Sequence, residues 1–506
     1  MGKVIEEKIL TAYKGMTTDA RIQDFAHAQM IKNMDAHSFL SKMVPFRDSE
    51  DGDSNSATRQ KQAFVIALWG PTGTYNLFAL GVKSGASTAE IHFKTTGTGG
   101  AADLSDNTWT SPTANQSSAG ATSFNVFVYY KQVGKIYGAR AGTNIWAFTP
   151  DGATAWDDSA GTFNYTTIAQ GLVHSKDDIL YIPYDNKIAS KNGAAAFNAT
   201  ALTLPQDKVI SSICEHGNYL AIATKPISGS GKSVVYLWDR DASLTTISDS
   251  IDWGNGLLQI LEDLDGTLVG VSFLNETFTT KIIFRSWVAG PESVVFKELT
   301  SVQTSTASND LLVQSKQKVD NRLYFLLSLK LNGVLEQGLW KIGKVNGQFA
   351  VTLDRTPNND TALVSGILSG FFIHKDYTFI SYQTNGAFAL SKTNDQYSFT
   401  ASGVYESIII NGGDSSLKKD LLGITLMTEP LASGAQVIVK YKTDQNTTFT
   451  TLFTSNALNA ISYSVSKQSG LLPTEFKELV LRFETKGGAI VTGLSWKIDI
   501  TDKRPY

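Results

Sequence analysis

Short runs of apolar residues, each bounded by Gly, Ser, Thr, Asn or Asp, follow one another along most of the chain. Several runs alternate apolar with polar residues, as in residues 437–442, VIVKYK. A period of two residues is typical of β-strands with one buried face. The period of 3.6 residues that is typical of helices is nearly absent after residue 60. The pattern therefore predicts an all-β protein built from many short antiparallel strands.

A polar turn followed at once by an alternating apolar strand recurs seven times between residues 61 and 400. The turns, each with the first residue of its strand, are Asn76 with Leu77, Gly134-Lys135 with Ile136, Asp177-Asp178 with Ile179, Gly217-Asn218 with Tyr219, Asp265-Gly266 with Thr267, Asn321-Arg322 with Leu323, and Lys375-Asp376 with Tyr377. The mean spacing is about 50 residues, and propeller blades of four strands repeat every 40–50 residues or so. We therefore predict a β-propeller of about seven blades over residues 61–400. A row of two-sheet β-sandwiches would give the same alternation and stays open as the alternative.

A tryptophan on the following strand marks four of these units, at Trp146, Trp238, Trp287 and Trp340. The first spacing, 92 residues, equals two blades, so the blade near residues 187–192 lacks the aromatic residue. A large ring at one position of each blade would fill the widening gap between neighbouring sheets. We expect these side chains to lie between blades.

The two ends of the chain differ in pattern from its middle. Residues 1–60 are expected to form an N-terminal arm that packs on the propeller or on a neighbouring subunit. Within that arm, the spacing of apolar residues predicts a helix over Thr17 to Met34. Residues 401–506 lose the blade period and carry longer alternating strands, which predicts a C-terminal β-sandwich of jelly-roll type.

Charge and cysteine content narrow the function classes. The 506 residues carry 44 basic and 47 acidic side chains, a formal net charge of -3, with no block of like charges. Tight binding to nucleic acid or to an anionic membrane needs an excess of Lys and Arg, so neither is expected. Cys214 is the only cysteine, so no intrachain disulfide and no cysteine-rich zinc site can form. Charged residues within the first ten positions argue against a secretory signal, and we expect no stable membrane association.

Three motifs suggest ligands but depart from their patterns. Gly229-Ser230-Gly231-Lys232-Ser233 resembles the end of a phosphate-binding loop, but a strand pattern follows it where a helix is needed, so we expect a hairpin tip. Asp51, Asp53 and Asn55 alternate like calcium ligands but lack the Gly and the Glu of a calcium loop, so calcium at Asp51–Asn55 stays an open question. Cys214 and His216 have no second pair to complete a metal site, so we expect a buried thiol beside a turn.

The remaining histidines are scattered along the chain without metal-ligand spacing. They are His27, His37, His92, His174 and His374. We assign none of them to a ligand.

One stretch matches the Asp-box of sialidase propellers in part. Residues Ser250 to Leu257 follow the Ser-x-Asp-x-Gly-x-x-Trp pattern, except that Leu257 replaces the final aromatic residue. Such a box stabilises a turn, because its Asp side chain accepts hydrogen bonds from backbone N–H groups. A sialidase would also need convergent arginines, for which Arg140, Arg240 and Arg285 are candidates. The sequence alone leaves their convergence open.

Three stretches together resemble virion proteins of short-tailed bacteriophages in which a propeller forms part of the tail nozzle or hub. They are residues 17–46 (TTDARIQDFAHAQMIKNMDAHSFLSKMVPF), residues 251–272 (IDWGNGLLQILEDLDGTLVGVS), and residues 417–444 with 476–496 near the C-terminus. The resemblance implies a homo-oligomeric ring in the virion, assembled in the host cytoplasm. Its partners would be an adaptor and fibres or spikes, with transient non-specific contact with exiting DNA.

The sequence-based prediction is therefore a structural component of a phage tail that is not an enzyme. It includes no catalytic residue, no metal ligand and no cofactor. The alternatives left open are a glycan- or protein-binding propeller module and a sialidase-like glycosidase, which would need acidic residues and arginines gathered near the ring axis.

Overall fold

The computed structural model is built almost entirely from β-strands. It describes residues 4–9, 16, 28–36, 38, 42–47, 49–51, 64–69, 76–82, 88–95, 117–119, 124–140, 144–148, 157–228, 231–243, 247–275, 280–289, 294–304, 311–331, 334–345, 347–357, 367–374, 376–384, 387–393, 399, 403–444 and 446–500. The only helical elements within these ranges are two short 3₁₀ turns, η1 (Lys131–Val133) and η2 (Lys467–Ser469). The predicted all-β fold class is confirmed.

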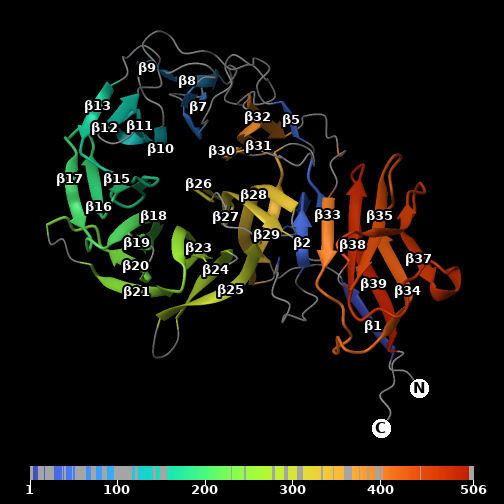
Figure 1. Cartoon of the computed structure of the whole chain (residues 1–506). Coiled ribbons are helices and arrows are strands. Elements are labelled where there is room, and N and C mark those ends of the chain that lie inside the picture. The colour runs from blue at the N-terminus through green and yellow to red at the C-terminus, as the bar shows by residue number, and fades with distance from the viewer. Residues whose placement is uncertain are drawn as a thin grey trace.

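Seven groups of four strands stand around a common centre (Figure 1). Blade one comprises β6 (Phe64–Trp69), β7 (Asn76–Val82), β8 (Thr88–Thr95) and β9 (Ser117–Ala119). Blade two comprises β10 (Phe124–Tyr130), β11 (Lys135–Arg140), β12 (Asn144–Phe148) and β13 (Asp157–Thr162). Blade three comprises β14 (Leu172–His174), β15 (Ile179–Tyr184), β16 (Lys187–Asn192) and β17 (Asn198–Thr203). Blade four comprises β18 (Lys208–His216), β19 (Tyr219–Pro226), β20 (Ser233–Trp238) and β21 (Asp249–Gly254).

The other three blades complete the ring. Blade five comprises β22 (Leu257–Leu264), β23 (Thr267–Asn275), β24 (Thr280–Ala289) and β25 (Val294–Thr304). Blade six comprises β26 (Leu311–Val319), β27 (Arg322–Leu331), β28 (Val334–Val345) and β29 (Gln348–Arg355). Blade seven comprises β30 (Ile367–His374), β31 (Tyr377–Thr384), β32 (Ala387–Thr393) and, from the N-terminal part of the chain, β5 (Ser49–Asp51). The predicted seven-bladed propeller is confirmed.

The ring is closed both at its centre and at its last blade. The first strand of each blade lies innermost and contacts the first strand of the next blade, and β30 of blade seven contacts β6 of blade one. Blade seven takes its fourth strand from the N-terminal segment, since β5 pairs with β32 antiparallel through Ser391↔Asp51 and Thr393↔Ser49. One blade is therefore made of two distant parts of the chain, which ties the first and last blades together.

The seven turns found in the sequence are the first hairpin of each blade. Two of these hairpins have two-residue loops with a positive φ at both positions, Asp265-Gly266 and Asp320-Asn321, and the second loop begins one residue before the predicted turn at Asn321-Arg322. This backbone suits the right-handed twist of the flanking strands and favours Asp, Asn and Gly. The repeat was therefore visible in the sequence because these hairpins require particular residue types.

The tryptophans lie on the third strand of their blades, as predicted. Trp238 packs edge-on against Tyr181 of blade three, with ring centroids 5.7 Å apart, and its side chain is fully buried. Trp340 is also fully buried and shares one core with residues of blade five such as Phe284. Trp287 packs against His216 of blade four, with ring centroids 4.7 Å apart. Each of these three indoles fills the space between its own blade and the preceding one.

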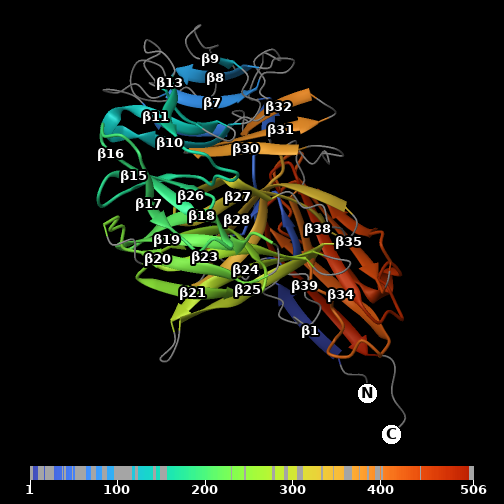
Figure 2. The same ribbon diagram turned by 60° about the vertical axis from the view of Figure 1, so that its left-hand side comes forward.

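A two-sheet β-sandwich lies to one side of the ring (Figures 1 and 2). One sheet has the order β1 (Val4–Ile9), β39 (Val491–Ile500), β34 (Lys419–Thr428) and β37 (Ser462–Ser466). The other has the order β2 (Ala28–Lys32), β33 (Gly403–Ser407), β38 (Leu479–Lys486), β35 (Gln436–Thr443) and β36 (Thr450–Ser455). A short pair, β3 (Met34–Asp35) and β4 (Val44–Pro45), lies nearby in the chain.

The second sheet of the sandwich continues into blade six. Strand β2 pairs in parallel with β29 at Lys32↔Leu353 and antiparallel with β33 at Ile31↔Tyr405, so β26 to β36 form one sheet of nine strands. A single hydrophobic core runs from Trp340 in blade six through Tyr405 to Trp496 in the sandwich. We call this junction of β29, β2 and β33 the joint sheet.

The helix predicted over Thr17 to Met34 is wrong where the structure describes it. Ala28–Lys32 is strand β2, and Met34 begins the short strand β3. The apolar residues Met30, Ile31 and Met34 are buried in the hydrophobic core shared by blade six and the sandwich, and this tertiary burial outweighs a local helical spacing. Residues 17–27 of the predicted helix lie outside the described residues.

Candidate functional site

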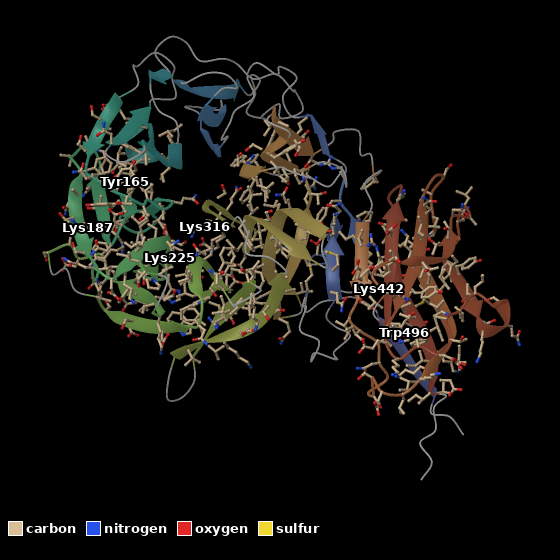
Figure 3. All side chains as sticks on the ribbon, viewed as in Figure 1. Tyr165, Lys187, Lys225, Lys316, Lys442 and Trp496 are labelled. Atoms are coloured by element: carbon tan, nitrogen blue, oxygen red, sulfur yellow. The ribbon has the colours of Figure 1, made fainter. Side chains whose placement is uncertain are left out.

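Polar side chains from three blades meet where β18, β22 and β26 run side by side near the ring centre. The Lys316 ammonium on β26 donates to the carbonyl of Ile213 on β18 (2.8 Å), to that of Leu261 on β22 (2.6 Å) and to Glu262 Oε2 (2.9 Å). An ammonium has three donors, and each finds an acceptor here. Figure 3 shows Lys316 on the inner side of the ring. This one side chain joins blades four, five and six.

His216 and Asp263 form a second polar pair between the inner strands of blades four and five. The His216 Nδ1 lies within hydrogen-bond distance of Asp263 Oδ2, and the Gly266 N–H donates to Asp263 Oδ1 (2.7 Å). Burial alone would raise the pKa of Asp263, but the hydrogen bonds from His216 and Gly266 outweigh it and lower that pKa below its usual range. Asp263 is therefore held as a carboxylate at neutral pH. We call Lys316, Glu262, His216 and Asp263 the inner-strand cluster.

Cys214 lies behind this cluster as a structural thiol. Its side chain is buried in the core between blades four and five. Burial, reinforced by the nearby Glu262 carboxylate, raises the pKa of the Cys214 thiol well above its usual range. A thiol in that state is a weak nucleophile. The expectation of a buried thiol beside a turn histidine is confirmed.

Further hydrogen bonds between neighbouring inner strands extend these ties on both sides of the cluster. Ser212 Oγ donates to the Leu261 carbonyl (3.3 Å), linking blades four and five. The Gln317 amide both donates to and accepts from the backbone of Ile373 (2.8 Å each), linking blades six and seven. Ser175 donates to Glu215 through its N–H (2.6 Å) and its hydroxyl (2.7 Å), linking blades three and four. Blades three to seven are thus tied in succession by directional bonds.

Lys225 makes one more tie between blades four and five, at the opposite end of their inner strands. Its ammonium donates to Gln259 Oε1 on β22 (3.0 Å), and burial lowers the pKa of this lysine. Figure 3 shows Lys225 on blade four.

A separate set of polar side chains joins blades three and four, at the end of these blades where their first hairpins lie. Arg240 forms an ion pair with Asp177 and donates to the Asn218 carbonyl through Nε (3.2 Å) and Nη2 (3.0 Å). Its Nη1 also donates to His174 Nδ1 (3.2 Å), since arginine has no acceptor. Tyr181 donates to Asp177 Oδ2 (3.1 Å), and burial raises the pKa of that tyrosine. Arg240 is therefore engaged in a contact between blades.

The Asp-box stretch acts as the sequence predicted. Asp252 Oδ1 accepts a hydrogen bond from the Gly254 N–H (2.8 Å), so the carboxylate caps the turn that ends β21. Trp253 is fully buried against Phe296 of blade five, with ring centroids 4.6 Å apart. Arg285 of blade five lies over the Trp253 ring and donates to the Trp253 and Asn255 carbonyls (3.0 and 2.7 Å). The stretch fastens blade four to blade five.

The three arginines considered for a sialidase site are not gathered in one place, as far as their described atoms show. Arg240 contacts blade three, and Arg285 contacts the end of β21. Arg140 belongs to strand β11, and its side chain lies outside the described residues. The two described arginines each serve a different contact between blades.

The phosphate-loop-like stretch lies between the paired strands β19 and β20, as expected of a hairpin tip, and its Gly229 and Ser230 lie outside the described residues. Lys232 lies before strand β20, its side chain is 70% exposed, and it pairs with Asp252 (2.6 Å). Ser233 Oγ donates to the Gly256 carbonyl (2.9 Å) and accepts from the Leu258 N–H (3.0 Å). These polar atoms serve the connection between blades four and five.

The remaining motif residues fall partly outside the described ranges. Asp51 belongs to strand β5, while Asp53 and Asn55 are not among the described residues. His374 ends strand β30 and stacks on Phe372, with centroids 6.2 Å apart. His92 belongs to β8, but its side chain is not among those described. His27 and His37 lie outside the described residues. Within the described ranges, no three His, Cys, Asp or Glu side chains lie close enough to hold a metal ion.

Charged residues also cross the joint sheet. Arg482 on β38 pairs with Glu406 on β33 (3.1 Å) and with Glu484 (2.7 Å). Lys440 on β35 pairs with Glu484 (2.8 Å), and Lys32 on β2 pairs with Glu336 of blade six (3.1 Å). Burial raises the pKa of Glu406 despite the neighbouring Arg482. A row of alternating charges therefore runs from blade six into the sandwich.

Sequence reasoning missed the inner-strand cluster. Only His216 was singled out, as a neighbour of Cys214, because Glu262 and Asp263 form no known motif and Lys316 lies more than fifty positions further along the chain. One signal was present, since Glu262 and Asp263 come just before a first-hairpin turn, and Lys316 and Lys318 hold similar positions in the next blade. Charged residues at the end of a strand that lies innermost are candidates for ties between blades.

Comparison with known proteins gives similarity of fold only. No family model matches the chain, and no curated protein matches it in sequence. The solved structures similar to it include a protein from Lactobacillus plantarum (14% identity, 63% of this chain and 95% of that one, TM-score 0.38). They also include the Dos1 propeller (10%, 72% and 93%, 0.35) and an exo-β-1,3-galactanase from Phanerochaete chrysosporium with galactose (11%, 89% and 100%, 0.33).

The prediction that the chain is not an enzyme is wrong on this comparison. Glycoside hydrolases stand among the similar structures. The exclusion rested on the absence of a recognisable catalytic motif, which a fold of this kind does not need to display in sequence. Identities of 10–14% with TM-scores below 0.4 assign no activity to this chain.

The described residues hold no membrane-spanning helix. None of them forms a helix of the length and hydropathy that crossing a bilayer requires.

Proposed function

We propose that this chain is a structural component of a short-tailed phage tail, a subunit of the nozzle or hub ring through which DNA leaves the particle. The observation that carries the proposal is the nine-stranded sheet that runs without a break from the inner strand β26 to the outer strand β36. A propeller and a sandwich connected only by a linker would move independently, because interfaces between domains are usually modest. Here backbone hydrogen bonds cross the junction.

The N-terminal segment strengthens this argument. It supplies β2 to the joint sheet and β5 to blade seven, so the same stretch of chain fastens the sandwich and closes the propeller. Pulling the sandwich away would require breaking several ladders together. Such a connection suits a part that must keep its shape under the force of DNA passage.

The net charge of the chain also supports a role as a conduit for DNA. The chain has a net charge of -3 and no basic block. Contact with DNA would therefore release few counterions, and the release of counterions is what drives non-specific DNA binding. A wall that binds phosphates weakly would let DNA pass. The proposed partners are further copies of the chain, an adaptor above the ring and fibres or spikes outside it, and the proposed location is the virion.

Electron-microscope class averages of the purified full chain, recorded at several concentrations and with native mass, would test the proposal. We expect rings with an axial opening and no retention of double-stranded DNA at about 150 mM salt. A chain that stays monomeric and does not assemble on tail particles that lack this protein would overturn it. Tight DNA binding that persists at that salt would contradict the conduit role but not the proposal that several copies of the chain form a ring.

A further inference from the structure

The outer side of the sandwich ends in a nearly uncharged stretch of chain. Residues 450–471, which we call the neutral edge, include a single charged residue, Lys467. At the chain's average of 18% charged residues, a stretch of this length would carry about four. Lys467 is itself neutralised by Asp420 (2.6 Å). The neutral edge therefore presents almost no electrostatic field.

The neutral edge is also apolar at its surface. Leu458, Ile461, Tyr463 and Leu471 are 65%, 60%, 43% and 56% exposed, and they are four of the nine large apolar side chains that are exposed among the described residues. The Tyr463 ring lies 4.7 Å from that of Phe453, which is buried in the sandwich core. The core of the sandwich thus reaches the surface here. Grouped apolar exposure of this kind marks interaction sites.

Both sheets of the sandwich end in open strands at this edge. Strand β36 is the last of the nine-stranded sheet, and β37 is the last of the four-stranded sheet. Proteins usually protect such edges with Lys, Pro or inward charges, and neither TTLFTS in β36 nor SYSVS in β37 contains any of these. The opposite edge of the same sheet, β1, carries Glu6, Glu7 and Lys8 and so has the protection that β37 lacks.

We propose that the neutral edge pairs with the neutral edge of a second copy of this chain, with β37 antiparallel to its mate across a two-fold axis. A neutral apolar surface fits another of its kind at little desolvation cost. Pairing of β37 with β1 of another copy would instead place Glu6 and Glu7 against a strand that carries no charge. The same patch on both copies makes the contact isologous.

This contact goes beyond the proposed ring. A ring needs head-to-tail contacts, whereas an isologous contact adds a two-fold axis. The two together would give a pair of rings joined through their sandwiches, and the neutral edge alone would give a dimer. The mass of the assembly therefore reports on the two contacts separately.

The test compares matched charge variants by light scattering and electron microscopy. Ser464→Lys and Ser464→Glu place like charges next to each other at the two-fold axis, because Ser464 is the central residue of β37, and its side chain is exposed enough that folding is unaffected. We expect each variant alone to have half the mass of the wild type. A 1:1 mixture should regain the full mass, because opposite charges then face each other. Ile227→Lys, at an apolar side chain of blade four that is 62% exposed, is the control and should leave the mass unchanged.

The outcomes separate the two proposals. A wild-type dimer with monomeric variants supports the neutral edge, and it refutes the ring if the chain also fails to assemble on tail particles that lack this protein. A double ring that becomes a single ring in the variants supports both. Variants that keep the wild-type mass, or a mixture that fails to regain it, overturn the neutral edge and leave the ring to be judged from its images. A wild type that is monomeric at every concentration overturns the neutral edge, and it overturns the ring as well if the chain does not assemble on tail particles that lack this protein.

Discussion

Neighbouring blades are held together in two different ways, by aromatic side chains in the outer part of the propeller and by polar ties at its centre. On the third strands, Trp238, Trp287 and Trp340 fill the gap to the preceding blade. On the first strands, Lys316 and Gln317 donate to backbone carbonyls of other blades. The outer contacts are apolar and tolerate many geometries, whereas the inner contacts are directional.

The difference follows from the geometry of a ring. Sheets that radiate from a centre diverge outward, so large rings are needed to fill the outer gaps at the density of a protein interior. At the centre the strands converge and leave no room for such rings. Short polar contacts can still act there, and they fix how far each strand slides along its neighbour. The outer contacts therefore fill the gaps between blades, and the inner contacts supply the alignment of the blades.

Truncation of Trp340 should have the largest effect. Trp340→Ala removes a fully buried indole from the core shared by blades five and six and leaves a cavity, at a cost of about 4 kcal/mol in the free energy of unfolding. Urea unfolding followed by far-ultraviolet circular dichroism would measure it. Trp340→Phe, which keeps most of the volume, should cost less than half as much. An equal loss in both variants would mean that gap filling is not the role of this side chain.

Loss of the three-blade tie should cost somewhat less. Lys316→Met removes the ammonium but keeps most of the stem, and it leaves Glu262 and two carbonyls without their donor, for about 3 kcal/mol. The double variant Lys316→Met/Glu262→Leu should regain part of this loss, because the unpaired carboxylate is then removed as well. A double-mutant cycle with the same urea assay gives the coupling. If the losses in unfolding free energy of the two single variants simply added in the double variant, the ion pair would contribute nothing to stability.

The outer contacts were predictable from the sequence, and the inner ones were not. Turn residues such as Asp265-Gly266 and the spaced tryptophans are local signals, since backbone φ and ring size restrict which residues fit. Lys316 bonds to carbonyls on β18 and β22, and a carbonyl belongs to every residue, so no residue type reveals the partner. The joint sheet could not be predicted from the sequence for a related reason. The parallel pairing of Lys32 with Leu353 joins segments about 320 residues apart, and no local pattern records it.

The His216–Asp263 pair predicts a pH dependence at the inner strands. The folded-state pKa of Asp263 is lowered, so the stability it contributes is present above its unfolded pKa of about 3.9 and is lost as pH falls through the folded value. Asp263→Asn should cost about 2 kcal/mol at pH 7 and make the unfolding free energy less dependent on pH below about 4. Urea midpoints at pH 7 and across the acid range would measure both effects. If the unfolding free energies of the wild type and the variant fell in parallel as the pH is lowered, this would contradict the lowered pKa of Asp263.

The smallest effect concerns the turn at the end of β21. Asp252→Ala should cost about 0.5 kcal/mol, because it removes the hydrogen bond from the Gly254 N–H at a half-exposed position. Lys232→Ala is the matched control, since Lys232 touches the same carboxylate from a solvent-exposed hairpin tip, and it should leave the unfolding midpoint unchanged. Thermal unfolding of the two variants side by side separates the capping bond from the ion pair. A loss in Lys232→Ala as large as that in Asp252→Ala would mean that the ion pair, and not the capped turn, fastens this end of blade four to blade five.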